Sequence, residues 1–480
     1  MPEPLGDPRV PGVPGTRTAA GGSELRRALG LRTTVSTSTG LAFAALEYLA
    51  AAGLVTYVAG DSAWIAIGVA GLLALLAWGF FGELNGMFPT AAAIRLYMRR
   101  AMDDRAALTI TFTYMTTIIL VIAADAFIVG TALAHAFDES AWVSAVWIVA
   151  LLAAAVVANL RGVQVAGGLQ DLATYAVLGA TCVVGAAALL RSHHGLRFPL
   201  EPLHGHSAGN FIEAVALGVF LYSAFEWVTT SAEEVRRPHH VHRGMLIAIG
   251  ILFVVCSLAT VAMSQVLTHH QLGSAYPQLA LGKAAFGQAG LWVMAGVTAV
   301  TALNTFNGGF ITASRFVYGT AREGSLPRPL ASLNTRAVPW VPVLALGGLS
   351  LVVALIVAVT HGWQVLVAVG AALEAMIYAV AAFCTLRLRR REPSRHRPFR
   401  VRAAKTLGVL GVGVFGALAV VASVSVGNRT DPVPLVIIAG AAAISAGYVM
   451  LILPKLRAKE AARRAATPRR RPPRPSAPVS

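Results

Sequence analysis

Apolar stretches about as long as a bilayer is thick follow one another along almost the whole chain. An α-helix needs roughly 20 residues to cross the hydrocarbon core. Twelve stretches approach or exceed that length, at about 36–58, 62–86, 107–134, 141–158, 169–190, 211–231, 243–267, 287–314, 340–360, 363–386, 406–427 and 432–453. With 56% hydrophobic and only 13% charged residues, a set of soluble domains is excluded. The sequence predicts an all-α integral membrane protein with 12 transmembrane helices.

The net charge of +17 has a topological explanation. With twelve spans and a cytoplasmic N-terminus, 35 of the 39 Lys and Arg residues fall in cytoplasmic segments. This is the positive-inside bias of a multi-pass protein of the cell membrane with both termini in the cytoplasm. Nucleic-acid binding, the usual alternative for a basic chain, is disfavoured because the charges lie between apolar runs without a basic fold motif.

Three polar regions flank or interrupt the predicted membrane domain. Residues 1–30 are rich in Gly and Pro and are expected to be a disordered cytoplasmic N-terminus. Residues 31–454 form the transmembrane domain, and residues 455–480 a basic, disordered cytoplasmic tail. The tail and the basic linker 387–405 either recognise anionic lipids or serve only orientation and solvation.

Four carboxylates inside predicted spans are taken as candidates: Glu47, Asp125, Glu226 and Glu374. A carboxylate in lipid is expensive, so each is a candidate functional group, whether as a proton carrier or as a ligand for a cationic group. The alternative for each is a protonated structural acid that hydrogen-bonds to a neighbouring helix. No Lys or Arg lies well inside a span, which favours a cationic or zwitterionic ligand.

Three segments carry a resemblance to a known family. They are GELNGMFPTAAAIRLYMRRA (82–101), YSAFEWVTTSAEEVRRP (222–238) and SRFVYGTAREGSLPRPLASLNTRAVPWVP (314–342). In order and spacing they resemble the amino acid–polyamine–organocation (APC) superfamily of permeases. The resemblance implies a LeuT-type core of two inverted five-helix repeats, here about 36–190 and 211–386, and two extra helices at 406–453. It also implies that spans one and six are broken near the midplane, where freed backbone groups bind substrate.

The sequence departs from the family pattern at both expected breaks. Where the family has Gly-x-Gly-Ile in span one, this chain has Ala-Ala-Leu-Glu (44–47), and Ala224 replaces the family glycine in span six. Glycine would allow the backbone to unwind and a substrate to approach. Hydroxyls at 36–39, Ser223, Thr229 and Thr230 are candidates to satisfy the freed backbone groups instead.

An internal similarity supports the pairing of the two spans. Ala45-Leu46-Glu47-Tyr48 and Ala224-Phe225-Glu226-Trp227 both read alanine, apolar, glutamate, aromatic. The candidate substrate-binding residues are Thr39, Ala45, Leu46, Glu47, Tyr222, Ser223, Ala224, Phe225, Glu226 and Asn304. The candidate coupling or gating residues are Glu47, Asp125, Glu226 and Glu374.

The remaining patterns suggest no cofactor. No metal-ligand spacing is found, and the cysteines lie in predicted spans as packing residues. The match to a dinucleotide fingerprint at 411–416 lies in an apolar span without a preceding strand, so close helix packing explains it better. An integral membrane enzyme is disfavoured because no catalytic cluster stands at a span boundary.

The resemblance implies a secondary active transporter of amino acids or polyamines across the plasma membrane. It would work by alternating access, either coupled to protons or as an exchanger. The alternative is a transport-inactive membrane sensor or receptor on the same fold, which the missing glycines favour.

Overall fold

The structure is a computed structural model that describes residues 30–44, 47–89, 93–140, 142–162, 167–192, 207–232, 235–237 and 239–466. Over this part of the chain the fold is almost wholly helical. The α-helices are α1 (Leu31–Ala44), α2 (Glu47–Ala59), α3 (Ala63–Met87), α4 (Ala93–Ala101), α5 (Asp104–Ala136), α6 (Val143–Leu160), α7 (Gly167–Leu190), α8 (Ala208–Leu221), α9 (His239–Val266), α10 (His269–Leu272), α11 (Pro277–Arg322), α12 (Trp340–Thr360), α13 (Trp363–Arg391), α14 (Ala404–Val424), α15 (Val433–Gly447) and α16 (Leu453–Ala466).

Short elements connect several of these helices. The 3-10 helices are η1 (Gly60–Ser62), η2 (Phe225–Ser231) and η3 (Arg328–Ala331), and a π-helical turn, η4 (Tyr448–Ile452), joins α15 to α16. Strands β1 (Ser425–Val426) and β2 (Arg429–Thr430) form a small antiparallel hairpin between α14 and α15.

The structure has eleven candidate spans in the described residues, so the expected count of twelve is not confirmed. The difference arises in the first expected span, 36–58, where the structure describes α1 up to Ala44 and α2 from Glu47, with residues 45–46 outside the described part of the chain. Helix α2 then continues through η1 into α3, and the stretch Leu49–Met87 counts as a single apolar run.

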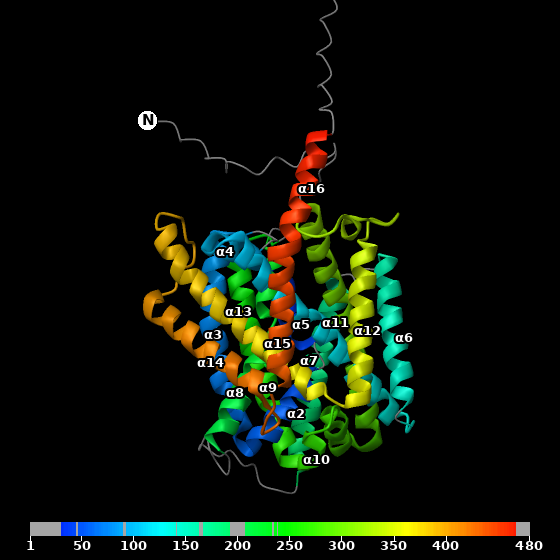
Figure 1. Cartoon of the computed structure of the whole chain (residues 1–480). Helices are drawn as coiled ribbons and strands as arrows, with labels where there is room; N and C mark the ends of the chain where they lie inside the picture. Colours follow the sequence, from blue (N-terminus) through cyan, green and yellow to red (C-terminus); the bar gives the residue numbers. More distant parts are fainter. Residues whose placement is uncertain are drawn as a thin grey trace, which may run out of the picture.

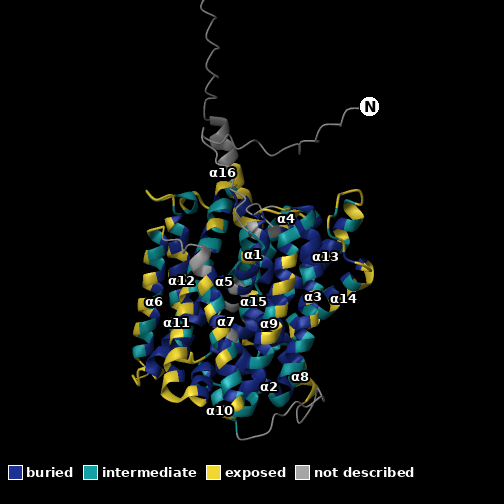
Figure 2. Ribbon diagram, turned by 180° about the vertical axis from the view of Figure 1, so that it is seen from behind, coloured by how far each residue is buried: buried dark blue, intermediate teal, exposed yellow. Residues whose placement is uncertain are grey.

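The spans differ widely in how far they are buried (Figure 2). Helices α5 and α13 are the most enclosed, whereas few residues of α15 are buried. Close packing in the interior depends on small residues. A side-chain carbon at Gly370 on α13 would come within 2.8 Å of the Phe220 ring on α8, so only glycine allows these two helices to approach so closely.

Helix α4, the segment 392–403 between α13 and α14, and helix α16 all lie at the same end of the molecule, and α10 lies at the other (Figure 1). Helix α16 extends through Ala466, into the first part of the stretch 455–480 that the sequence analysis assigns to the tail. Alanine, lysine, arginine and glutamate are strong helix formers and dominate this stretch. Arg457 also anchors it by a 2.7 Å hydrogen bond to Asp104 at the start of α5.

Candidate binding site at an interrupted helix

The sixth expected span is interrupted close to its acidic residue. Helix α8 ends at Leu221, and the chain continues as the 3-10 helix η2 from Phe225. Between them Ala224 has φ +65°, a left-handed conformation that costs a non-glycine residue roughly 1–2 kcal/mol. The interruption implied by the resemblance is therefore present even though the family glycine is absent.

A side chain from α1 supports the interrupted backbone. The hydroxyl of Ser38 donates a 2.7 Å hydrogen bond to the carbonyl of Phe225, and both residues are fully buried. An unmade hydrogen bond at a buried carbonyl would cost about 1–3 kcal/mol. One of the hydroxyls at 36–39 thus serves the role proposed for that group. Ser36 instead donates to a carboxylate oxygen of Asp171 on α7.

The corresponding part of span one is described incompletely. Helix α1 ends at Ala44 and α2 begins at Glu47, while Ala45 and Leu46 lie outside the described residues, as does the side chain of Glu47. Thr39 is fully buried on α1, and its hydroxyl meets no hydrogen-bond partner in the described part of the chain.

Glu226 and Glu374 form a buried acid pair that joins η2 to α13. Their exposed fractions are 0% and 2%, so solvent cannot stabilise charge on either. Both acids border Tyr378 of α13: Glu226 accepts from its hydroxyl, and Glu374 lies one turn before it on the helix. None of the ion pairs among the described residues involves either glutamate. A single proton shared between two neighbouring buried carboxyl groups would avoid burying two like charges.

Two tyrosines complete the pair. Tyr378 on α13 donates a 3.3 Å hydrogen bond to Oε2 of Glu226, and Tyr114 on α5 donates a 3.0 Å bond to Oε2 of Glu374. Trp227 Nε1 donates in turn to the Tyr114 hydroxyl at 3.0 Å. The second oxygen of each carboxyl, Oε1, meets no donor in the described part of the chain. One oxygen of each acid is fixed, and the other is left for a proton or a ligand.

The aromatic side chains around the break are packed rather than open. Phe225 lies 6.3 Å from Phe81 on α3 and 5.9 Å from Tyr378 between ring centroids. Tyr222 is fully buried and donates a 3.1 Å hydrogen bond to the carbonyl of Ile67. Ser223 is half-buried beside them. That Phe225 covers a bound substrate stays a prediction.

The other candidates are not brought into the acid pair. Asp125 is fully buried on α5, but it is eleven residues beyond Tyr114 and so roughly 16 Å further along the helix axis. Asn304 is half-buried on α11. Their proposed roles stay predictions.

The structure also buries acids that the sequence analysis did not count among those inside spans. Asp171 and Glu213 fall within the expected fifth and sixth spans, and Glu83 within the second, and all three are buried. Their positions inside apolar stretches were the signal that could have identified them. Nothing local marks Tyr114 and Tyr378, because aromatic residues in spans most often only pack.

Taken together, an apolar helical domain with an interrupted helix and a buried acid pair beside the interruption defines a membrane transporter. Residues 29–444 match the model of a family described as amino acid permease. The chain belongs to that family. The resemblance to the APC superfamily stated from its three segments is thereby confirmed.

Individual relatives are only distantly similar. The chain is 28% identical to the Asc-type amino acid transporter 1 of Mus musculus over 44% of this chain and 39% of the relative. It is 29% identical to the large neutral amino acids transporter small subunit 2 of Mus musculus, over 51% and 46%. It is 26% identical to a probable GABA permease of Pseudomonas aeruginosa, over 72% and 75%. The chain thus spans less than half the length of the first two of these relatives. All are transporters or permeases rather than enzymes.

Solved structures support the fold. A manganese transporter of Eremococcus coleocola, solved with an aromatic bis-isothiourea substituted compound, superposes with a TM-score of 0.59. The match covers 90% of this chain and 98% of that chain at 14% sequence identity. At this identity the likeness concerns the fold alone. With the family match it confirms the LeuT-type helical class.

Proposed function

We propose that this chain is a secondary active transporter of amino acids in the plasma membrane, with both termini in the cytoplasm. The observation that carries the proposal is the Glu226–Glu374 pair beside an interrupted helix. The family match and the transporter names of its relatives support the substrate class. The gathering of α4, the segment 392–403 and α16 at one end supports the orientation, because these elements carry much of the basic charge.

The substrate's ammonium group would bind at the acid pair. A cation placed between Glu226 and Glu374 would replace the shared proton and meet the two Oε1 atoms that lack donors. The carboxylate would bind at backbone amides freed where α2 and η2 begin, because the N-terminus of a helix favours an anion. An amino acid has both groups close together, so one molecule can contact both sides of the break.

Coupling would follow from the exchange of the shared proton for the ammonium group. Loading of substrate requires that the pair lose its proton, and release allows the pair to regain it. Such linkage moves protons with or against the substrate as the site alternates between the two sides of the membrane. Obligatory exchange of one amino acid for another is the alternative coupling mode, and the same pair would then stay charged only while occupied.

The test is uptake into proteoliposomes of radiolabelled neutral and cationic amino acids, γ-aminobutyric acid and polyamines, with and without a pH gradient. We expect saturable uptake of at least one amino acid that a pH gradient alters. Glu226→Gln and Glu374→Gln should each remove the effect of the gradient in protein that elutes as a single folded species. Uptake that is the same across pH in the wild type and in both variants would refute the coupling role. Absence of uptake for the whole panel would refute the substrate class.

A sensor without turnover is the second candidate. It was favoured by the absence of glycines, but the break at Ala224 weakens that argument. Binding of an amino acid without flux in the same proteoliposomes would support it.

A further inference from the structure

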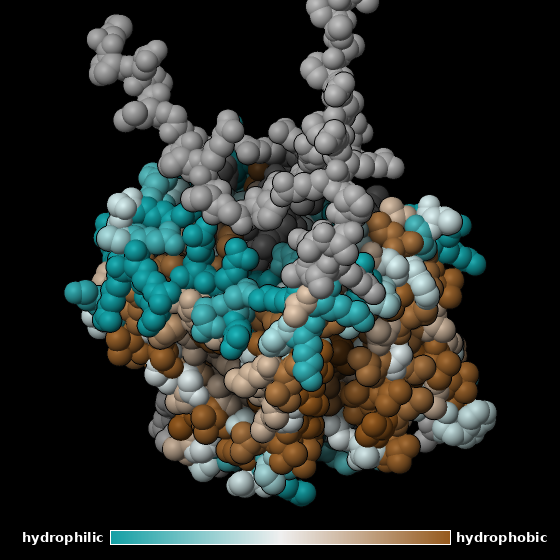
Figure 3. Space-filling view, turned by 45° about the horizontal axis from the view of Figure 1, so that its top comes forward, coloured by the Kyte–Doolittle hydropathy of each residue, from teal (hydrophilic) through white to brown (hydrophobic). Residues whose placement is uncertain are grey.

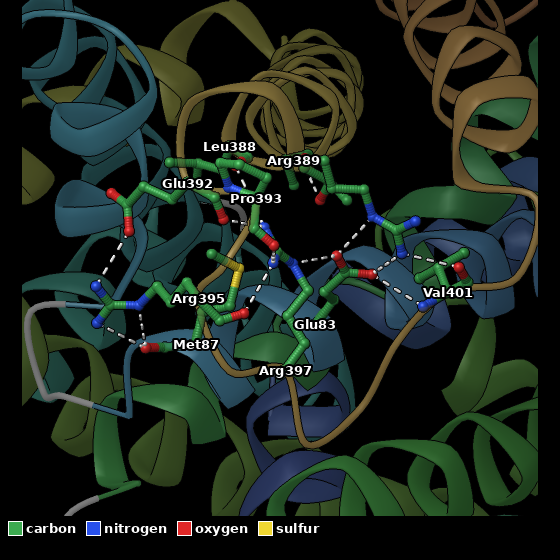
Figure 4. A network of polar contacts seen from close by, with 11 residues as sticks. Glu83, Met87, Leu388, Arg389, Glu392, Pro393, Arg395, Arg397 and Val401 are labelled. Carbon is green, nitrogen blue, oxygen red and sulfur yellow. Dashed lines mark hydrogen bonds and ion pairs between the residues drawn. The ribbon is translucent and has the colours of Figure 1, made fainter.

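A buried glutamate outside the candidate site, Glu83, links helix α3 to the C-terminal end of α13 and to the segment that follows it. Glu83 lies near the C-terminus of α3, and its side chain is 1% exposed. The sequence singles it out as part of the 82–101 segment, but the proposed transport mechanism does not use it. Its carboxylate is surrounded by groups from α13 and from segment 392–403 (Figure 4).

The contacts of this carboxylate come from helix α13 and from the segment 392–403 that follows it. Arg389 of α13 makes a two-pronged contact, Nε to Oε1 at 2.8 Å and Nη2 to Oε2 at 2.5 Å. Arg397 of the segment places Nε 3.3 Å from Oε1. The backbone N–H of Val401 donates to Oε2 at 2.9 Å. Two cations and an amide thus satisfy one buried anion, and such two-pronged geometry fixes orientation as well as distance.

The arginines also fix the backbone around them. Arg389 donates to the Val401 carbonyl at 2.8 Å. Arg397 donates to the carbonyls of Leu388 and Glu392, at 3.2 and 2.9 Å, where α13 ends. The same two carbonyls also accept backbone N–H groups, Leu388 from Glu392 and Glu392 from Arg395. We call Glu83, Arg389, Arg397 and Val401 the α3–α13 clasp.

Two members of the clasp, Glu83 on α3 and Arg389 on α13, lie on helices that also border the candidate site. On α3, Phe81 precedes Glu83 by two residues and contacts Tyr378 of α13 with ring centroids 5.8 Å apart. Tyr378 donates to Glu226, and Glu374 lies one turn before it on α13. The position of α13 against α3 therefore determines where Glu374 and Tyr378 stand relative to Glu226.

We propose that Glu83 is a positioning residue for the Glu226–Glu374 pair: through Arg389 and Arg397 it holds α13 at the separation from η2 that lets the two carboxyl groups share a proton. The inference rests on the proposed function only where it assigns the acid pair a role in transport. The positioning itself concerns the free protein and is testable without substrate.

The first measurement is hydrogen exchange of the Val401 amide in protein embedded in lipid nanodiscs, followed by mass spectrometry on peptides that cover 399–404. We expect Glu83→Gln and Glu83→Ala to accelerate exchange by about tenfold or more, because the amide loses its acceptor or the segment loosens. Arg390→Gln is the matched control. Arg390 adjoins Arg389 but is exposed, so its substitution should leave the exchange unchanged. Unchanged exchange in both Glu83 variants would overturn the clasp.

The second measurement tests whether the clasp acts on the Glu226–Glu374 pair or stabilises only the end of α13. The melting temperature of the substrate-free protein is followed against pH in the wild type, Arg389→Gln and Arg390→Gln. We expect Arg389→Gln to shift the midpoint of this profile by about half a pH unit or more, with no shift in Arg390→Gln. In a Glu374→Gln background the Arg389 substitution should have no further effect, because the two act through one pair. An equal shift in both backgrounds, or none in either, would overturn the proposal whether or not transport is observed.

Discussion

The hydroxyl of Ser38 on α1 and the carbonyl of Phe225 on η2 are joined by a 2.7 Å hydrogen bond across 187 residues of sequence. This bond ties the first half of span one to the interrupted part of span six. It places a side chain where the backbone of a broken helix would otherwise lack a partner in an apolar interior.

Ser38→Ala should therefore destabilise the break. The Phe225 carbonyl would be left buried without a donor, at a cost of about 1–3 kcal/mol. We expect a lower melting temperature and reduced uptake. Ser38→Thr, which keeps the hydroxyl, is the control and should retain most of both. Equal behaviour of the alanine and threonine variants would show that the bond does not matter.

Ala224→Gly should stabilise the protein. Glycine adopts positive φ without the penalty that the alanine side chain brings, but it also loses more conformational freedom on folding. The net gain should be up to about 1 kcal/mol. Ala216→Gly, within helix α8, is the opposite control and should cost roughly 0.5–1 kcal/mol. The measurement is the thermal unfolding of both variants in the same lipid. A lower stability of Ala224→Gly as well as of Ala216→Gly would contradict the left-handed conformation at position 224.

Tyr114→Phe should affect binding more than Tyr378→Phe. The Tyr114 hydroxyl both donates to Glu374 and accepts from Trp227, whereas the Tyr378 hydroxyl donates a longer bond, of 3.3 Å, to Glu226. With about 1 kcal/mol for each hydrogen bond lost, affinity should fall roughly fivefold more in the first variant. Calorimetric titration with a transported amino acid measures the difference. Identical losses would mean that the Trp227 bond contributes nothing.

The outward-facing basic residues near the clasp should bind anionic lipids. Hydrophilic side chains gather at the end of the molecule that carries segment 392–403, above a hydrophobic belt (Figure 3). Arg400, Arg402 and Lys405 are exposed there, and each charge near an anionic surface contributes about 1 kcal/mol. Replacing all three by glutamine should lower retention of phosphatidylglycerol relative to phosphatidylcholine in native mass spectrometry. Equal retention of both lipids by wild type and variant would leave these residues a role in solvation only.

The helical membrane class followed from the sequence because apolar length is a local property that a window of residues reveals. Glu226 was identified for a similar reason, since an acid inside an apolar stretch is visible without any partner. Its pairing with Glu374, 148 residues later, was not predicted, because helix packing decides it. The same holds for Glu83 and Arg389, which are 306 residues apart.

The number of candidate spans among the described residues, eleven and not twelve, could not be predicted from hydropathy alone. Hydropathy marks residues 36–58 as one apolar stretch, whereas the structure describes α1 up to Ala44 and α2 from Glu47, with residues 45–46 outside the described part. Hydropathy measures the length of an apolar stretch and does not show where a helix within it begins or ends. The interruption at Ala224 was implied only by the family resemblance, and the residue that supports it, Ser38, lies 187 residues away from Phe225 in sequence.

Because an alanine occupies the bend in span six, the bend is maintained by tertiary contacts and not by the flexibility of a single position. Residues that contact the bend come from three other helices, α1, α3 and α13, so the local sequence can change as long as those neighbours keep their places. A carrier of this kind can lose the glycine signature by which its relatives are recognised and still keep the shape that the signature was thought to require.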